Sequence, residues 1–166
     1  MTSDETAVTL RPARPEDVAP LAELWYAGFV DGHVGHVPEA LVEVRTRESF
    51  DDRVTAALDH TTVAEVADEI AGFVMVVGDE VEQVYVGRDH RGTGVATVVL
   101  GEGERLVAQN GHAEAWLAVA TGNARARRFY ERRGWTDGGA FDYPANTQIG
   151  PVPVPCHRYV KAVRPG

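Results

Sequence analysis

Three runs rich in β-branched residues follow one another through the middle of the chain with almost nothing between them. They are Thr62–Ala67, Ile70–Val77 and Val81–Val86, and acidic turns at Asp68-Glu69 and Gly78-Asp79-Glu80 connect them. β-Branched side chains favour extended strands, and links of two or three residues join neighbouring antiparallel strands. The sequence therefore predicts a fold built around an antiparallel meander.

The rest of the chain alternates between strand and helix patterns. Further strands are predicted at Val8–Arg11, Ala113–Val119, Trp135–Phe141 and His157–Val163, and helices from Pro15 and at Arg47–Leu58, Gly94–Gln109 and Asn123–Arg133. This order predicts an α+β fold in one domain, residues 1–166, with a mixed, mostly antiparallel sheet of about seven strands and about four flanking helices. Two segments rich in turn formers, Gly28–Pro38 and Tyr143–Pro155, are predicted to be loops.

Charge and cysteine content exclude several classes of protein. With 16 basic and 25 acidic residues the formal net charge is −9, which argues against binding to nucleic acid phosphates. The lone Cys156 allows no internal disulfide, as in reducing compartments. Met1–Ala7 lacks the pattern of a signal peptide, and no apolar run approaches membrane-spanning length. We therefore expect a cytoplasmic protein without nucleic acid or membrane partners.

A glycine-containing turn links the last strand of the meander to the next helix. The strand Val84-Tyr85-Val86 leads into Arg91-Gly92-Thr93-Gly94-Val95-Ala96 and then the helix. Glycines allow close backbone approach, and the first turn of a helix offers unpaired N–H groups to an anion. The glycines alone leave phosphate binding and a plain turn equally supported. Thr97 departs from the dinucleotide-binding fingerprint, and no Gly-Lys-Ser/Thr follows as in a P-loop.

This turn resembles the Arg/Gln-x-x-Gly-x-Gly/Ala signature of the GNAT superfamily of N-acetyltransferases, with Ala96 in the last position. The resemblance implies the GNAT fold and acetyl-coenzyme A (acetyl-CoA) as the donor. It also implies that backbone amides of the turn bind the coenzyme's pyrophosphate and that the flanking strand contacts the coenzyme. The expected coenzyme contacts are Val84, Val86, Arg91, Gly92, Thr93, Gly94, Val95 and Ala96.

A second segment, Asn123 to Trp135, also resembles the family, through its order of Asn, Ala, an aromatic-Tyr pair, a charged pair and Gly-aromatic. By this resemblance Asn123 contacts the pantetheine arm or places a water molecule, and Tyr130 is the general acid that protonates the departing thiolate. Ala126 and Phe129 are better explained as the core face of a helix. Five arginines lie here, at 125, 127, 128, 132 and 133. Some could meet the remaining coenzyme phosphate, while solvation explains most of them.

The acceptor amine must lose a proton before it can attack, because an amine with a pKa near 10.4 is mostly protonated at neutral pH. Strand alternation predicts that Glu80, Glu82, Val84 and Val86 share one face. The resemblance assigns the base to the position two before Val84, which is Glu82, with Glu80 as the reserve; a solvent-exposed face is the alternative for both. It also implies that the Val84 amide polarises the thioester carbonyl and that the amine attacks directly. Cys156 is predicted to be a buried structural thiol.

The resemblance places the acceptor site along Trp25–Arg47, so Phe29, Asp31 and His33 are candidate substrate contacts, with Asp31 pairing a cationic amine. We expect no metal, because His33 and His36 lack further ligands. The predicted function is acetyl transfer to a primary amine of a small molecule or peptide in a ternary complex. A non-catalytic coenzyme A-binding or sensing module and the use of a longer acyl-CoA remain alternatives. The sequence leaves the acceptor, and the choice between monomer and homodimer, open.

Overall fold

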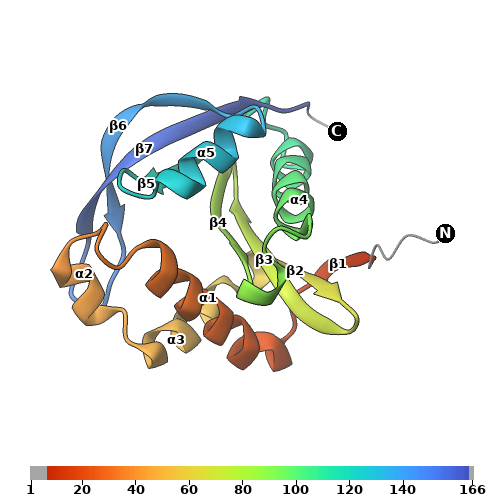
Figure 1. Ribbon diagram of the computed structural model, residues 1–166, viewed down its shortest axis with the longest axis horizontal. Coiled ribbons are helices and arrows are strands. Elements are labelled where there is room, and N and C mark those ends of the chain that lie inside the picture. Colours follow the sequence, from red (N-terminus) through yellow and green to blue (C-terminus); the bar gives the residue numbers. More distant parts are fainter. Residues whose placement is uncertain (1–6, 165–166) are drawn as a thin grey trace.

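A computed structural model describes residues 7–164 and contains a seven-stranded sheet (Figure 1). The strands are β1 (Val8–Pro12), β2 (Thr61–Val66), β3 (Glu69–Val77), β4 (Glu80–Val86), β5 (Glu114–Ala120), β6 (Thr136–Ala145) and β7 (Val152–Ala162). Their order is β1-β2-β3-β4-β5-β7-β6, and β4 and β5 are the one parallel pair of neighbours in this sheet. The predicted meander and the mostly antiparallel sheet are confirmed.

Helices cover both faces of the sheet. They are α1 (Val18–Gly32), α2 (Glu39–Val44), α3 (Arg47–Ala57), α4 (Val95–Gln109) and α5 (Ala124–Arg132), with short 3-10 turns at Pro15–Asp17, Leu58–His60 and Arg88–His90. Figure 1 shows α1, α2 and α3 together, apart from α4 and α5. None of the helices in the described part of the chain has the length and apolar character that crossing a lipid bilayer requires.

Strand β3 explains this two-sided arrangement. Its central residues are all buried because consecutive side chains point to opposite faces and both faces are covered. Val74 packs into the core beneath α4, whereas Phe73 and Met75 pack against the helices α1 and α3. The sheet therefore separates two apolar cores.

The two segments predicted as loops, Gly28–Pro38 and Tyr143–Pro155, are in part regular structure. Helix α1 continues to Gly32, because Gly28 lies against the ring of Tyr85 and the helix can approach β4 closely there. Strand β6 continues to Ala145 and β7 begins at Val152, so only residues 146–151 connect them. These predictions underestimated how well both segments pack.

Prolines are tolerated in β7 because of the direction in which their nitrogens face. The carbonyl of Pro155 accepts a hydrogen bond from the Thr121 amide, on the side of β5. Its nitrogen faces the same side, and the ladder with β5 ends at Cys156. The nitrogen of Pro153, two residues earlier in the strand, points to the same side, where β5 no longer runs alongside. Neither proline nitrogen points toward β6, so neither proline removes a hydrogen bond from the ladder between β6 and β7.

Strands β4 and β5 touch at a single position and then separate. Glu80 opposite Trp116 is their one paired position. The Asp79 carbonyl accepts from the Trp116 amide at 3.0 Å, and the Asp79 carboxylate accepts from the Trp116 indole at 3.1 Å. These bonds hold the strands together at one end, and a wedge opens beyond it (Figure 1).

We predict that Gly28→Ala lowers the free energy of unfolding by about 1–3 kcal/mol, the usual cost of overpacking. A Cβ at this position would lie 2.3 Å from Tyr85 Cδ1. The matched control is Gly101→Ala in α4, where a Cβ meets nothing within 4 Å; it should stabilise by about 0.5–1 kcal/mol because alanine is the better helix former. Urea denaturation measures both changes, and equal effects would contradict the packing argument.

Candidate functional site

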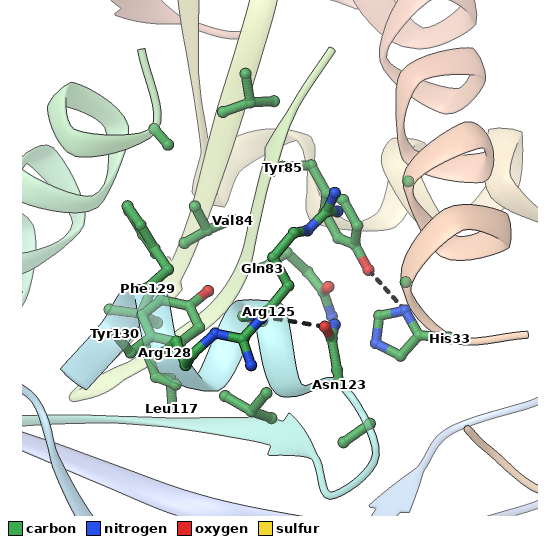
Figure 2. A pocket seen from close by; sticks show the side chains of 18 of the residues that line it. His33, Gln83, Val84, Tyr85, Leu117, Asn123, Arg125, Arg128, Phe129 and Tyr130 are labelled. Carbon is green, nitrogen blue, oxygen red and sulfur yellow. Dashed lines mark hydrogen bonds between the residues drawn. The ribbon is translucent and has the colours of Figure 1, made fainter. Parts of the chain in front are cut away.

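A cavity of about 370 Å³ occupies the wedge between β4 and β5. Its walls come from β4, β5, the start of α4, one face of α5 and the end of α1 (Figure 2). Among the candidate residues from the sequence, the lining includes Glu82, Val84, Val86, Arg91, Gly92, Ala96, Asn123 and Tyr130. The structure therefore brings both sequence motifs to one cavity.

The backbone of β4 offers hydrogen-bonding groups to this cavity. The Gly87 amide donates to the Ala71 carbonyl at 2.8 Å, so Gly87 faces β3. Backbone groups alternate in direction along a strand, and Val86 and Val84 therefore face away from β3, toward β5. Since β5 has already separated from β4, these groups face the wedge rather than a neighbouring strand.

The segment Arg91–Ala96, which leads into the first turn of α4, has the geometry of an anion-binding site. This segment is called the cradle below. Gly92 and Gly94 adopt φ values of 77° and 93°, which L side chains rarely adopt. The Thr93 hydroxyl donates a hydrogen bond to the His90 carbonyl. The Val98 amide donates to the Gly94 carbonyl, which is the first hydrogen bond of the helix. The amides before Val98 in the first turn of α4, among them that of Ala96, therefore have no partner within the helix. Val95 contributes a buried side chain that anchors this turn in the core.

Helix α5 adds an aromatic hydroxyl to the cavity. Asn123 caps the helix by accepting a hydrogen bond from the Ala126 amide at 3.2 Å. Tyr130 packs edge-on against Trp135 at 6.2 Å between ring centroids. Burial raises the pKa of Tyr130 above its usual value, and the nearby Tyr85 adds to this rise. Its hydroxyl is therefore protonated throughout the neutral range.

The same helix presents a basic face to the cavity. Arg125, Arg128 and Arg132 recur at helical spacing and all line it, and Figure 2 shows the first two on α5 beside Asn123. None of the three forms an ion pair or a side-chain hydrogen bond with any residue between 7 and 164. Arg127 instead bonds Tyr159 and Asp137. Arg125, Arg128 and Arg132 are exposed, so the prediction that solvation explains most of the five arginines stays open, and these three also line the cavity.

A second cavity of about 320 Å³ lies against α1, α2, α3 and β6. The two cavities share His33, Glu82, Gln83, Tyr85, Ala118 and Ala120. Phe29 and His33, both predicted as substrate contacts, line this second cavity. Cys156 also lines it and is buried, as predicted, and burial raises the pKa of its thiol to about 11.

Glu80 and Glu82 do not share a face with Val84, contrary to the prediction from strand alternation. Met75 pairs with Gln83 and Val76 with Val81, so Glu82 is the extra residue of a β-bulge. The bulge reverses which side chains of β4 point to each face of the sheet. Glu80 therefore lines only the second cavity, and Glu82 lines both cavities. The Glu80 carboxylate accepts a 2.7 Å hydrogen bond from Tyr143, and burial raises its pKa.

Asp31 is not available to pair with an acceptor amine, which corrects another prediction. Its carboxylate accepts hydrogen bonds from Arg88 at 2.6 and 2.7 Å and from Arg91 at 2.9 Å. Both arginines belong to the segment around the cradle, and Asp31 lines neither cavity. Asp31 therefore ties the end of α1 to the cradle.

Arg45 lines the second cavity and belongs to the segment Trp25–Arg47 that was expected to border the acceptor site. The sequence did not point to three further residues of this cavity, Arg53, Gln83 and Tyr85. Tyr85 follows from the corrected alternation of β4, because it lies opposite Phe73 on the face of α1. Arg53 carried no local signal, because its helix α3 shows no motif and lies far from the glycine turn in the sequence.

The comparisons with known proteins agree with this geometry. A sequence model of the acetyltransferase (GNAT) family matches residues 22–135. A GCN5-related N-acetyltransferase structure from Rhodopseudomonas palustris has a TM-score of 0.74 at 23% identity, covering 98% of this chain and 99% of that one. PaiA N-acetyltransferase from Thermoplasma acidophilum, in complex with coenzyme A, has a TM-score of 0.67 at 18% identity, with coverage of 94% and 99%. YncA from Salmonella typhimurium, with its cofactor acetyl-CoA, has a TM-score of 0.66 at 17% identity, with coverage of 94% and 94%. No curated protein matches the chain.

We predict that His33 makes the protein acid-sensitive. Burial, together with smaller contributions from the charges of Arg53 and His36, lowers the pKa of His33 to about 4. In the unfolded chain the pKa of His33 is near 6.5. Between pH 6.5 and pH 4 the imidazole therefore binds a proton in the unfolded chain but not in the folded one. Stability therefore falls as pH drops from about 6.5 toward 4.

Urea unfolding at pH 7 and pH 5 measures this effect. Replacing His33 by glutamine should reduce the acid loss by on the order of 2 kcal/mol. His60→Gln removes an exposed imidazole and is the matched control. An equal acid loss in wild type and the His33 variant would contradict this prediction.

Proposed function

Because this chain belongs to the acetyltransferase (GNAT) family, we propose that it transfers an acetyl group from acetyl-CoA to a primary amine of a small molecule or peptide. Family membership makes the chain an acyltransferase. The observation that carries the finer proposal is the wedge, in which backbone groups of Val84 and Val86 and the cradle meet Tyr130 in one cavity. This cavity joins a second one at Glu82.

The donor side fits acetyl-CoA. The unpaired amides of the cradle suit a pyrophosphate, and Ala96 leaves room for it. The free edge of β4 can pair with the amide groups of a pantetheine arm in the way a strand would. Arg125, Arg128 and Arg132 supply positive charge for a further phosphate in a chain that is otherwise acidic. The coenzyme-bound structures of PaiA and YncA, which share the fold, support this assignment.

In this proposal the reaction is direct attack, with acetyl-CoA supplying an activated acetyl thioester. Glu82 accepts a proton from the ammonium form of the acceptor, directly or through water, because it borders both cavities. The Val84 amide donates to the carbonyl oxygen as negative charge develops there. The new C–N bond replaces the C–S bond, and Tyr130 donates a proton to the leaving sulfur. The nitrogen loses its second proton as the amide forms, and this proton returns through water to Tyr130, while Glu82 releases its proton to solvent. Glu80, held by Tyr143, is the reserve base.

Isothermal titration calorimetry with acetyl-CoA, followed by thiol release over an amine panel, tests the function. We expect coenzyme binding and amine-dependent release of free coenzyme A. Absence of coenzyme binding overturns the proposal. Binding without turnover on any amine would instead indicate a non-catalytic coenzyme module, and faster release from longer acyl-CoA donors would revise the acyl group.

We predict that Tyr130→Phe lowers kcat by on the order of a hundredfold or more while leaving the Kd for acetyl-CoA nearly unchanged. The reason is that the hydroxyl acts on the leaving sulfur and not on the coenzyme in its ground state. Steady-state kinetics and calorimetry measure the two quantities. Tyr26→Phe, which alters a hydroxyl outside both cavities, is the matched control; an unchanged rate in the Tyr130 variant removes it from the mechanism.

We predict that Glu82→Gln lowers kcat/KM at pH 7 by on the order of a hundredfold. The deficit should shrink as pH rises, because amines with a pKa near 10.4 then lose their proton without help. A pH-rate profile of wild type and variant measures this, with the exposed Glu69→Gln as control. A full rate at every pH would transfer the role to Glu80, which Glu80→Gln then tests.

A further inference from the structure

Two arginines of the second cavity have no part in the chemistry described so far. Arg45 follows the last turn of α2 and Arg53 lies on α3, and both line the second cavity but not the first. Arg45 is only 6% exposed. Two guanidinium groups thus face a small cavity whose other charged residues are Glu80 and Glu82.

Neither guanidinium has a counterion among the residues that the structure describes. Within residues 7–164, Arg45 and Arg53 form no ion pair and no side-chain hydrogen bond, unlike Arg47 between them, which pairs with Glu23 and Asp51. Arg53 stacks on the rings of Trp25, at 4.0 Å, and Phe50, at 5.0 Å. Stacking uses the face of a guanidinium, so its in-plane N–H donors remain available.

The burial of these charges is unfavourable without a partner. Burial lowers the pKa of Arg45, and it lowers that of Arg53 to about 9 with a further contribution from the charge of Arg45. Two neighbouring like charges that are shielded from solvent are stabilised when an anion binds between them. The cavity is therefore suited to an anionic group.

We propose that the acceptor is a free amino acid or a similar amine that carries a carboxylate, which Arg45 and Arg53 bind. This inference rests on the proposed acetyl transfer and identifies the class of its acceptor. The amine of such a molecule lies at Glu82, where the two cavities meet, and its carboxylate extends into the second cavity. Glu82 and Arg53 line the same cavity of about 320 Å³, so one short molecule bound there can contact both.

The size of the cavity agrees with a small zwitterion. A volume of about 320 Å³ is at the lower end for small-molecule sites. The connection between β6 and β7 covers one side, because Asn146 lines the cavity and Gln148 donates to the Val44 carbonyl at 3.1 Å. A peptide N-terminus carries an amide where an amino acid carries its carboxylate, so it lacks the group that the arginines would bind.

The experiment compares matched amines at fixed acetyl-CoA. The panel consists of the common L-amino acids, β-alanine and 4-aminobutyrate, each paired with its carboxamide, together with short peptides. We expect kcat/KM for the best acids to exceed that of their carboxamides by on the order of ten- to a hundredfold, as for loss of a charged hydrogen bond. Equal or faster turnover of carboxamides or peptides, or no turnover of any acid, overturns the inference. Failure of the proposed function is seen separately, as absence of acetyl-CoA binding by calorimetry.

Variants then assign the preference to the arginines. Arg45→Gln and Arg53→Gln should each reduce the ratio of acid to carboxamide turnover, while acetyl-CoA affinity stays unchanged. Arg53→Lys, which keeps a charge, should retain part of the ratio. Arg47→Gln removes a paired arginine outside both cavities and should leave the ratio intact. If the ratio survives in folded Arg45 and Arg53 variants, as judged by thermal melting, these arginines do not bind the carboxylate.

Discussion

Strands β4 and β5 share one paired position, Glu80 opposite Trp116, and the rest of the site depends on the gap beyond it. The gap leaves the backbone groups of Val84 and Val86 without a strand partner, in a protein whose neighbouring ladders are otherwise continuous over many residues. Unpaired backbone groups are costly unless water or a ligand satisfies them. The Asp79–Trp116 bonds hold the closed end of the wedge, so the open end can be wide without separating the sheet.

A second local irregularity connects the two cavities. The β-bulge at Glu82 changes which side chains of β4 face α1 and which face α5. Tyr85 consequently points toward α1, where Gly28 makes room for its ring, and its hydroxyl lies 3.4 Å from His33 Nδ1 (Figure 2). Glu82 itself remains at the boundary. One inserted residue thus places a carboxylate where the proposed donor and acceptor sites meet.

The sequence predicted the parts of the site that depend on local geometry. The cradle at Arg91–Ala96 and the Asn123 cap require particular residues at particular backbone positions, so they leave a motif. The faces of Glu80 and Glu82 could not be predicted, because a bulge depends on how two strands pair and not on either strand alone. Asp31 was assigned wrongly for a similar reason, since its partners Arg88 and Arg91 are distant in the sequence.

The sequence alone predicted the order of elements and the antiparallel meander, because both follow from side-chain periodicity and short turns. It also marked the glycine turn at Arg91–Ala96 as a candidate anion site, because glycines allow close approach of the backbone to a ligand. Two features of the first cavity could be seen only in the folded protein. One is the position at which β4 and β5 separate, and the other is that Arg125, Arg128 and Arg132 line the same cavity as the cradle. The same holds for Arg45 and Arg53, which line a second cavity and form no ion pair within residues 7–164. These features arise from contacts between segments far apart in the chain, and the residues involved have no local pattern that marks them.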